Sequence, residues 1–393
     1  MVSTNNLISY GKQNINQADV DAVVEILHSD FLTQGPVVPV FENTVAGYCG
    51  SKYGVAVNSA TSALHIACLA IGVGKDDVVW TSSITFVASA NCALYCGAKV
   101  DFIDIDPRTY NLSVQCLSEK LEIAKMTGTL PKVVIPVHLC GQSCDMEKIY
   151  ELGQKYGFKI IEDASHAIGA RYLDKMVGGC TYSDITVFSF HPVKIITTGE
   201  GGMALTNDIK LAENMKQLRS HGITKDSSKM NPHPSEELWG YQQMELGYNY
   251  RLSDIHAALG LSQMKRLEMF ISERRFIADR YNNLLSELPI VTPWQKSYGD
   301  SSFHLYVIRL NLEEINRTHC QVFNDLHAAG ILVNLHYIPV YRQPYYEKMG
   351  FLKGYCPEAE RYFSDAITLP VYPGLTEIEQ DQVVTAVKLA TSV

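Results

Sequence analysis

Short apolar runs alternate with helical patterns along the first two thirds of the chain. Between Asn16 and Asp30, apolar residues recur at positions 20, 23, 24 and 27, which is the spacing of one helix face. Next come YGVAVNS (53–59), a predicted strand, ATSALHIACLAIG (60–72), a predicted helix, and DDVVWTS (76–82), another strand. Further strand candidates are KVDFID, KVVIPVH, FKIIEDAS and DITVFSF, separated by helical stretches such as DMEKIYELGQKYG. This alternation predicts an α/β fold with a mostly parallel central sheet covered on both faces.

The pattern changes in the last third of the chain. A long helical pattern starts at Ser253, and after Pro289 come FHLYVIRL, the helical QVFNDLHAAG, and ILVNLHYIPV. The closing TEIEQDQVVTAVKLA has the spacing of an amphipathic helix. We therefore predict two domains. A large domain covers residues 1–252, and residues 253–393 form a bridging helix and a smaller α+β domain.

Composition narrows the class of protein. Hydrophobic residues make up 46% of the 393 residues and charged residues 19%, so the chain can bury a sizeable core and is not of the disordered class. The formal net charge is −9. This acidic balance gives no electrostatic reason to expect nucleic acid or an anionic membrane as a partner. Any phosphate must therefore be bound locally, at a built site.

The lack of a recognisable targeting signal and the pattern of cysteines both favour a cytoplasmic location. No apolar run reaches the ~18 residues that span a bilayer, and the start, MVSTNNLISYGKQ, has no signal-peptide pattern. Ten scattered cysteines then favour free thiols in the cytoplasm. Cys92 and Cys96, like Cys140 and Cys144, are four positions apart, a spacing that raises the possibility of zinc. Their neighbours are apolar, so we predict core thiols and no metal site.

Candidate chemistry gathers where the predicted strands end, which is where open α/β sheets bind ligands. The residues Ser59-Ala60-Thr61-Ser62 open a helix, whose unpaired N–H groups suit a phosphate; alone, they would be an ordinary N-cap. Asp163 follows FKIIE, and a buried carboxylate is costly unless something positive meets it. Lys194 lies between DITVFSF and the glycine-rich TTGEGG. It is a candidate for a Schiff base, although an isolated lysine is usually a solvated charge.

In combination, these groups match the needs of pyridoxal phosphate. Its phosphate would lie on the helix start and its ring against Phe86 in SSITFVAS. A carboxylate at position 163 would keep the pyridine nitrogen protonated, so that the ring accepts electrons. The lysine would form the Schiff base and then carry the proton.

The motifs that carry these groups resemble those of the DegT/StrS family of sugar aminotransferases, which have the aspartate aminotransferase-like fold (fold type I of pyridoxal phosphate enzymes). The resemblance runs from LTQGPVVPVFE (32–42) to LPVYPGL (369–375), and its most specific block is SFHPVK…TTGEGG. NSATSAL, DASHA and FSFHPVKIITTGEGG look most like the branch of pseudaminic acid synthesis. That branch implies transfer of an amino group from L-glutamate, through pyridoxamine phosphate, to C4 of a UDP-linked 4-keto-6-deoxy-N-acetyl hexose.

The resemblance also implies roles for single residues. Lys194 matches the Schiff-base lysine, Asp163 the partner of the pyridine nitrogen, and Phe86 the aromatic stacked on the ring. His166 stands where the family commonly has a glutamine that bonds the phenolic oxygen of the cofactor. The implied contacts to the phosphate and its helix start are Ala60, Thr61, Ser62 and Ser189. Asn249 matches an asparagine that reaches the phosphate from the neighbouring subunit, which implies a homodimer with shared active sites.

The same resemblance implies substrate contacts at Tyr10, Thr33, Gln34, His336 and Tyr337. His191 closely follows a predicted strand and could touch cofactor or substrate. Each of these six could equally be a loop residue satisfied by backbone groups, and Arg219 is either a ligand or one of a surface pair. The alternatives left open are an aminotransferase for another nucleotide-linked keto sugar, aminated at C3 or as another C4 epimer, and a non-catalytic binding protein of this fold. A related dehydratase would lack the lysine, and a nucleotide-sugar oxidoreductase would need a G-x-G-x-x-G turn that the chain does not contain.

Overall fold

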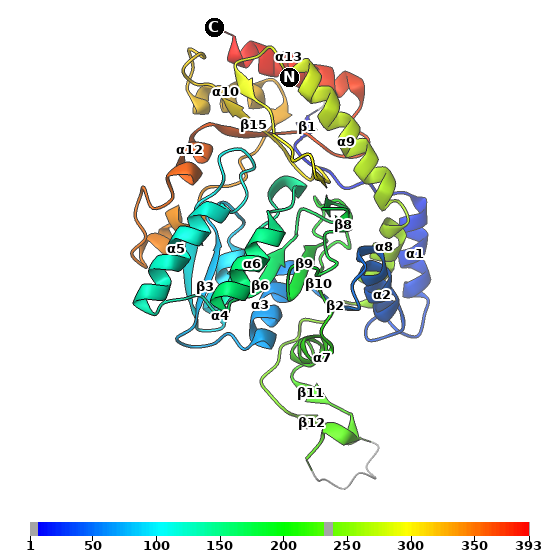
Figure 1. Cartoon of the computed structure of the whole chain (residues 1–393). Helices are drawn as coiled ribbons and strands as arrows, with labels where there is room; N and C mark the ends of the chain where they lie inside the picture. The colour runs from blue at the N-terminus through cyan, green and yellow to red at the C-terminus, as the bar shows by residue number, and fades with distance from the viewer. Residues whose placement is uncertain (1–6, 232–238, 393) are drawn as a thin grey trace.

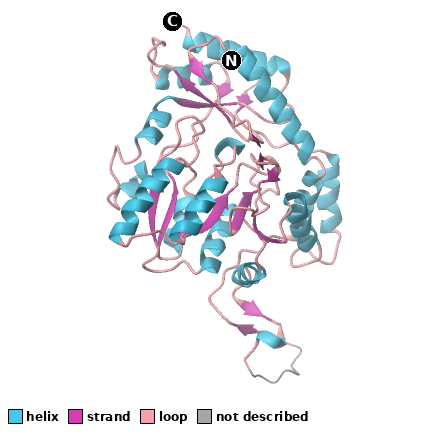
Figure 2. Ribbon diagram, viewed as in Figure 1, coloured by secondary structure: helices cyan, strands magenta, loops and turns pink. Residues whose placement is uncertain are grey.

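The computed structural model of the chain describes residues 7–231 and 239–392. Residues 1–6, the first part of the segment in which we predict no signal peptide, lie outside the described residues. A large body built around one sheet carries a smaller layer of sheet and helices beside the C-terminus (Figure 1). Helices flank the large sheet in the same view (Figure 2).

The central sheet has seven strands in the order β2-β10-β9-β6-β5-β3-β4. Their bounds are β2 Tyr53–Val57, β3 Val78–Ser82, β4 Lys99–Ile103, β5 Val133–Ile135, β6 Lys159–Asp163, β9 Ile185–Ser189 and β10 Gly202–Thr206. All pairs are parallel except those of β10, which runs antiparallel to both β2 and β9. The predicted strands are therefore present, and β10 is the one that the alternation of strand and helix did not reveal.

The two faces of the sheet are covered by different helices. Neighbouring residues of a strand point to opposite faces, so Val133 and Ile135 of β5 enter one hydrophobic core and Val134 enters another. The first core includes residues of α3 (Ala60–Ile71), α4 (Ala88–Tyr95) and α7 (Ile209–Leu218). The second includes residues of α5 (Val114–Thr127) and α6 (Met146–Tyr156). An apolar run such as KVVIPV follows from this burial on both sides.

The predicted long helix after Ser253 is two helices. Helix α8 (Asp254–Met264) packs on α1 (Gln17–Leu27) and α2 (Val37–Cys49), and α9 (Leu267–Leu284) contacts α13 (Glu377–Thr391). The break falls at Arg266, whose φ of −112° and ψ of 4° are not helical. Asp254 is fully buried and accepts the N–H groups of Gly35 and Val37 at 2.8 and 2.9 Å. This carboxylate fixes the loop before α2, a helix that the apolar pattern alone did not predict.

The C-terminal part contains a second, antiparallel sheet. Its order is β13-β15-β17, with bounds Ile290–Val291, Tyr306–Leu310 and Ala366–Leu369. Helices α10 (His319–Ala328) and α13 share its core. Strand β1 (Ile8–Ser9) pairs in parallel with β16 (Ile331–Leu332), so the N-terminal residues join this part of the structure. The domain boundary between residues 252 and 253 stays a prediction.

The remaining elements are short. They are β7 Arg171–Tyr172, β8 Lys175–Met176 and β14 Gly299–Asp300 in one small sheet, the hairpin β11 Ile223–Thr224 with β12 Gln242–Gln243, helices α11 Pro344–Glu347 and α12 Pro357–Asp365, and the 3-10 turns Leu139–Gly141, Ser227–Lys229 and Val340–Arg342. Within residues 7–231 and 239–392, no helix is both long enough and apolar enough to cross a membrane.

Strand β10 passes unusually close to the start of α3. A Cβ atom on Gly202 would lie 2.4 Å from the backbone nitrogen of Ala60 and 2.5 Å from the carbonyl carbon of Ser59. These are backbone atoms that no side-chain rotation can move. Only a glycine therefore lets the antiparallel strand support the first turn of this helix.

We expect Gly202→Ala to lower the free energy of unfolding by about 1–3 kcal/mol, because the new methyl group overlaps backbone. Urea unfolding followed by circular dichroism measures it. The matched control is Gly47→Ala in α2, where an added Cβ meets nothing within 4 Å; it should be neutral or stabilising by about 0.5–1 kcal/mol. Equal stability of the two variants would contradict the close approach of β10 to α3.

Candidate active site

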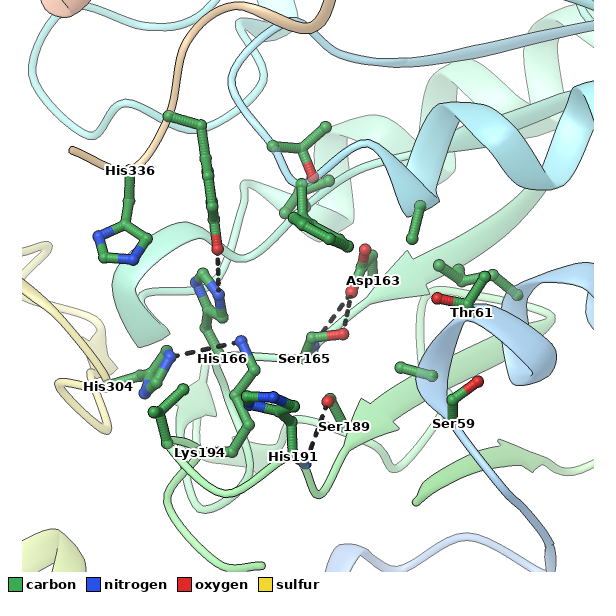
Figure 3. Close-up of a pocket in the computed structure, with 18 of the residues that line it drawn as sticks. Ser59, Thr61, Asp163, Ser165, His166, Ser189, His191, Lys194, His304 and His336 are labelled. Atoms are coloured by element: carbon green, nitrogen blue, oxygen red, sulfur yellow. Dashed lines mark hydrogen bonds between the residues drawn. The ribbon is translucent and has the colours of Figure 1, made fainter. Parts of the chain in front are cut away.

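A cavity of about 420 Å³ lies where strands β6 and β9 end and helix α3 begins. Its lining combines residues from the large sheet with residues from the C-terminal part, including His304 and His336. Figure 3 shows the labelled histidines 166, 304 and 336 on one side of the cavity, Ser59 and Thr61 on the opposite side, and Asp163 with Lys194 between them. Most of the site residues predicted from the sequence therefore line this one cavity, although they come from distant parts of the chain.

Lys194 follows β9 and presents its amine to the cavity. The side chain is partly buried, and its Nζ lies 3.4 Å from Nε2 of His304. Burial lowers the pKa of Lys194 to about 8, against the opposing influence of Asp163 and Cys140, which raise the pKa. Because an ordinary lysine has a pKa near ~10.4, this amine is neutral over a much wider pH range. A neutral amine is what nucleophilic and base chemistry requires.

Asp163 is the last residue of β6 and is only 5% exposed. Ser89 donates its hydroxyl to Oδ2 at 2.6 Å, and Ser165 donates its hydroxyl and its N–H to Oδ1 at 2.6 and 3.1 Å. No ion pair to this carboxylate occurs among the described residues. Its charge is thus oriented by neutral donors and can still meet a cationic group in the cavity.

The start of α3 forms the anion-binding side of the cavity. Ser59 is the N-cap and accepts the N–H of Ser62 at 3.1 Å, while Ser59, Ala60 and Thr61 line the cavity. The hydroxyl of Ser62 donates to Asn58 at 2.6 Å, and Ser62 is not part of the lining. The unpaired N–H groups and the positive end of the helix dipole suit a phosphate.

Phe86 lies at the cavity with 58% of its surface exposed. Its ring centroid is 6.2 Å from that of Tyr337 in a tilted arrangement. An aromatic side chain that is so exposed beside a cavity offers one face to a planar ligand. The structure therefore puts an available aromatic surface where the sequence predicts ring stacking.

His166 is held in one tautomer by the backbone. Its Nδ1 accepts the N–H of Cys140 at 3.2 Å, so the ring proton is on Nε2, which lies 3.2 Å from the hydroxyl of Tyr337. Burial first, and then the nearby Lys194 and His336, lower the pKa of His166 well below its ordinary value. The ring is therefore neutral and presents an N–H donor to the cavity.

Five further predicted residues line the cavity: Tyr10, Ser189, His191, His336 and Tyr337. Besides Ser62, four predicted residues do not line it: Thr33, Gln34, Arg219 and Asn249. Arg219 forms an ion pair with Glu42 and donates to the carbonyl of Ala56 at 2.6 Å. The other three are exposed. Their roles as ligands stay predictions, as do the roles of the residues inside the cavity.

The sequence reasoning missed two contributors. Ser89 orients Asp163, and His304 contacts Lys194. Ser89 comes three residues after Phe86, near the start of α4. A search for polar side chains close to Phe86 could have found it. His304 is 110 positions away from Lys194, and a single histidine inside the run FHLYVIRL carries no signal of its own.

The cysteines form no metal cluster in the described part of the chain. No three histidine, cysteine, aspartate or glutamate residues are grouped there to hold a metal ion. All ten cysteines are free thiols, and six of them are buried. Cys92 and Cys144 lie in hydrophobic cores, and Cys96 and Cys140 pack against one of these cores. The absence of a metal site stays a prediction.

Known proteins resemble this chain over nearly its whole length. Residues 13–388 match the DegT/DnrJ/EryC1/StrS aminotransferase family. The UDP-4-amino-4,6-dideoxy-N-acetyl-beta-L-altrosamine transaminase of Campylobacter jejuni subsp. jejuni serotype O:23/36 is 39% identical over 376 residues, which are 93% of each chain.

Two solved structures share the fold. Helicobacter pylori PseC, an aminotransferase involved in the biosynthesis of pseudoaminic acid, superposes with a TM-score of 0.88 at 30% identity, covering 98% of this chain and 99% of that one. The putative sugar aminotransferase Spr1654 from Streptococcus pneumoniae, in its PLP form, has a TM-score of 0.87 at 27% identity and 98% coverage of both chains. These likenesses confirm the aspartate aminotransferase-like fold. The chain belongs to the DegT/DnrJ/EryC1/StrS aminotransferase family and is an enzyme of that family.

Proposed function

We propose that this enzyme is a pyridoxal phosphate-dependent aminotransferase that moves an amino group from L-glutamate to C4 of a UDP-linked 4-keto-6-deoxy-N-acetyl hexose, as in the pseudaminic acid pathway. One observation carries the proposal. Lys194, whose pKa is lowered, and Asp163, whose carboxylate is buried, follow the ends of neighbouring strands. Both residues line the cavity that the start of α3 also lines. Amine, carboxylate and anion site are the three groups that this cofactor needs.

The residues present fit the cofactor. The N-terminus of α3 would hold its phosphate, together with Thr61 and Ser189 at the cavity wall. Phe86 would cover one face of its ring, and Asp163 would meet its pyridine nitrogen. Relatives in PLP and PMP forms support this choice. When bound, the cofactor supplies an electron sink that stabilises a carbanion next to the transferred nitrogen.

The protein side chains do the rest of the chemistry. Lys194 would hold the cofactor covalently at rest and, once released, would take a proton from the α-carbon of glutamate or deliver one to C4 of the sugar. Asp163 would balance the positive charge of the pyridine nitrogen. The N–H that His166 carries on Nε2 points into the cavity and would donate to the phenolic oxygen. This donor replaces the amide of the glutamine that is common in the family.

The choice of sugar rests on similarity. The C. jejuni relative is named for a UDP-linked 4-amino sugar, and PseC for the corresponding pathway. Tyr10, His191, His336 and Tyr337 line the same cavity as Lys194. They would meet the sugar with hydroxyl groups and imidazole nitrogens, which can donate to or accept from hydroxyl and N-acetyl groups. Another nucleotide-linked keto sugar, aminated at C3 or as another C4 epimer, is the alternative.

A homodimer with shared sites is part of the proposal. Asn249 is exposed and lies outside the cavity of its own chain. An exposed amide in GYNYR is therefore free to reach the phosphate of a second copy. Ten free thiols agree with a reducing compartment, and we propose the cytoplasm as the location.

A substrate panel tests the reaction. We expect L-glutamate to convert the yellow protein to the pyridoxamine form and the UDP-linked 4-keto sugar to convert it back, with the C4 configuration of the product read by NMR. Lys194→Ala should lower turnover about 10³-fold or more, whereas Lys216→Ala, at an exposed lysine of α7, should not. A colourless protein that ignores pyridoxal phosphate, or turnover by Lys194→Ala, would contradict the proposal.

Covalent capture of the cofactor should follow the titration of Lys194. The ammonium form below pH 8 is inert, so the capture rate should rise with pH and level off above the pKa of about 8. Between pH 7 and pH 9 the neutral fraction rises about ten-fold. Stopped-flow absorbance of apo-protein mixed with pyridoxal phosphate measures the rate. A rate that still climbs steeply above pH 10 would indicate an ordinary lysine.

Hybrid dimers test the shared site. Asn249→Ala alone should release the cofactor about ten-fold faster, because a hydrogen bond to a charged group is lost. Mixing it with Lys194→Ala after dissociation should recover about a quarter of the wild-type activity without added cofactor, since half of the dimers would contain one intact site. If no mixture exceeds the two parents, Asn249 serves its own chain or no site at all.

A further inference from the structure

His304 is the group in contact with the amine of Lys194. It lies just before β15, is 4% exposed, and its Nε2 is 3.4 Å from Nζ. Figure 3 shows the ring of His304 directed at that amine across the cavity edge. The distance is at the long end for a hydrogen bond and suits a side chain that must also move away.

The position of His304 is fixed by a buried cation. Arg274 is 1% exposed and donates to the carbonyls of Phe303, His304 and Val371 at 3.3, 3.1 and 2.8 Å. On the other side, the hydroxyl of Ser302 donates to the carbonyl of His166 at 2.9 Å. The backbone that carries His304 is thus tied to the large sheet, to α9 and to the C-terminal part, so the ring has little freedom to leave Lys194.

The surroundings keep His304 neutral. The pKa of His304 is held well below its ordinary value, first by burial. Nearby groups lower it further, namely those of Lys194, His166, Arg274 and His336. A neutral ring can accept a hydrogen bond at Nε2 when its proton is on Nδ1. Nδ1 is buried and has no hydrogen-bond partner among the described residues.

That unpartnered nitrogen argues against a merely structural role. A buried polar atom without a partner costs stability, so a side chain needed only for packing would be apolar here. His166 differs, because its Nδ1 is satisfied by the N–H of Cys140. The one polar contact that His304 makes through its ring, among the residues that the structure describes, is the contact with Lys194.

We propose that His304 is a positioning residue for Lys194: its Nε2 accepts an N–H of the ammonium form and holds the side chain at the cavity edge whenever the amine is not joined to the cofactor. No bond other than this hydrogen bond forms or breaks. The inference rests on the proposed role of Lys194 as the cofactor-binding lysine. Asp163 and Cys140 also raise the pKa of this amine, and Lys194 in turn lowers the pKa of the neighbouring His166 and His336. The test therefore compares variants at position 304 alone.

Three substitutions separate the hydrogen bond from the volume of the ring. His304→Gln can place an amide oxygen near the position of Nε2, His304→Asn places its amide near Nδ1, and His304→Leu has neither. Each apo-protein is mixed with pyridoxal phosphate across pH, and the covalent capture rate is followed by absorbance. Borohydride reduction and peptide mapping then verify that the label is on Lys194. This readout does not depend on turnover.

We expect His304→Leu and His304→Asn to lower the apparent pKa of capture by about one pH unit, because the ammonium form loses its acceptor. Their rate at the high-pH plateau should fall about ten-fold, since the amine is no longer held in place. His304→Gln should restore both values toward wild type. Urea midpoints of all three variants report whether they remain folded.

Two kinds of outcome would overturn the inference, and they are distinguishable. If wild-type protein captures the cofactor at Lys194 and all three variants share its pH profile and plateau, His304 does not position the lysine. A positioning role is also excluded if His304→Asn and His304→Gln behave alike. If wild-type protein does not label Lys194 at any pH, the proposed function itself fails, and the positioning role of His304 fails with it.

Discussion

Burial of one amine without a carboxylate in contact with it is the constraint around which this cavity is built. Charged groups leave water at a large cost, and the chain lowers that cost by letting Lys194 lose its proton near pH 8. An ion pair between Lys194 and Asp163 would stabilise the ammonium form, and the amine would then stay protonated and unreactive. The structure instead surrounds the acid with serine donors and presents a neutral imidazole, His304, to the amine. The amine and the carboxylate thus share one cavity without forming an ion pair.

The architecture makes this separation possible. Neighbouring parallel strands β6 and β9 deliver the acid and the lysine to the same edge of the sheet. The antiparallel β10 then comes close enough to support the first turn of α3, where its glycine leaves room for the helix start. Residues from beyond position 300 close the opposite wall. The cavity therefore exists only where these two parts of the chain meet.

Much of the fold was predictable because a strand buried on both faces of a sheet is recognisable in the sequence as a short apolar run. Strand β5 is apolar at every position, and in β6 the apolar pair Ile160 and Ile161 comes shortly before Asp163, which lines the cavity. Asp163 and Lys194 could be found in this way, and family likeness supplied Phe86 and Asn249. Helix α2 and strand β10 were not evident from alternation, because α2 is held by the distant Asp254 and β10 by its two neighbours. His304 could not be predicted, since its partner is far away in sequence and its neighbours look like any strand.

The pairing of β1 with β16 has a consequence for synthesis of the protein. Tyr10 lines the cavity, and its backbone bonds to Leu332 and Val371, which are translated some three hundred residues later. A nascent chain on the ribosome can thus complete most of the central sheet while this wall of the cavity is missing. Only after release of nearly the whole polypeptide can Tyr10 take its place. The site matures last, and a truncated chain would assemble a scaffold with an open flank.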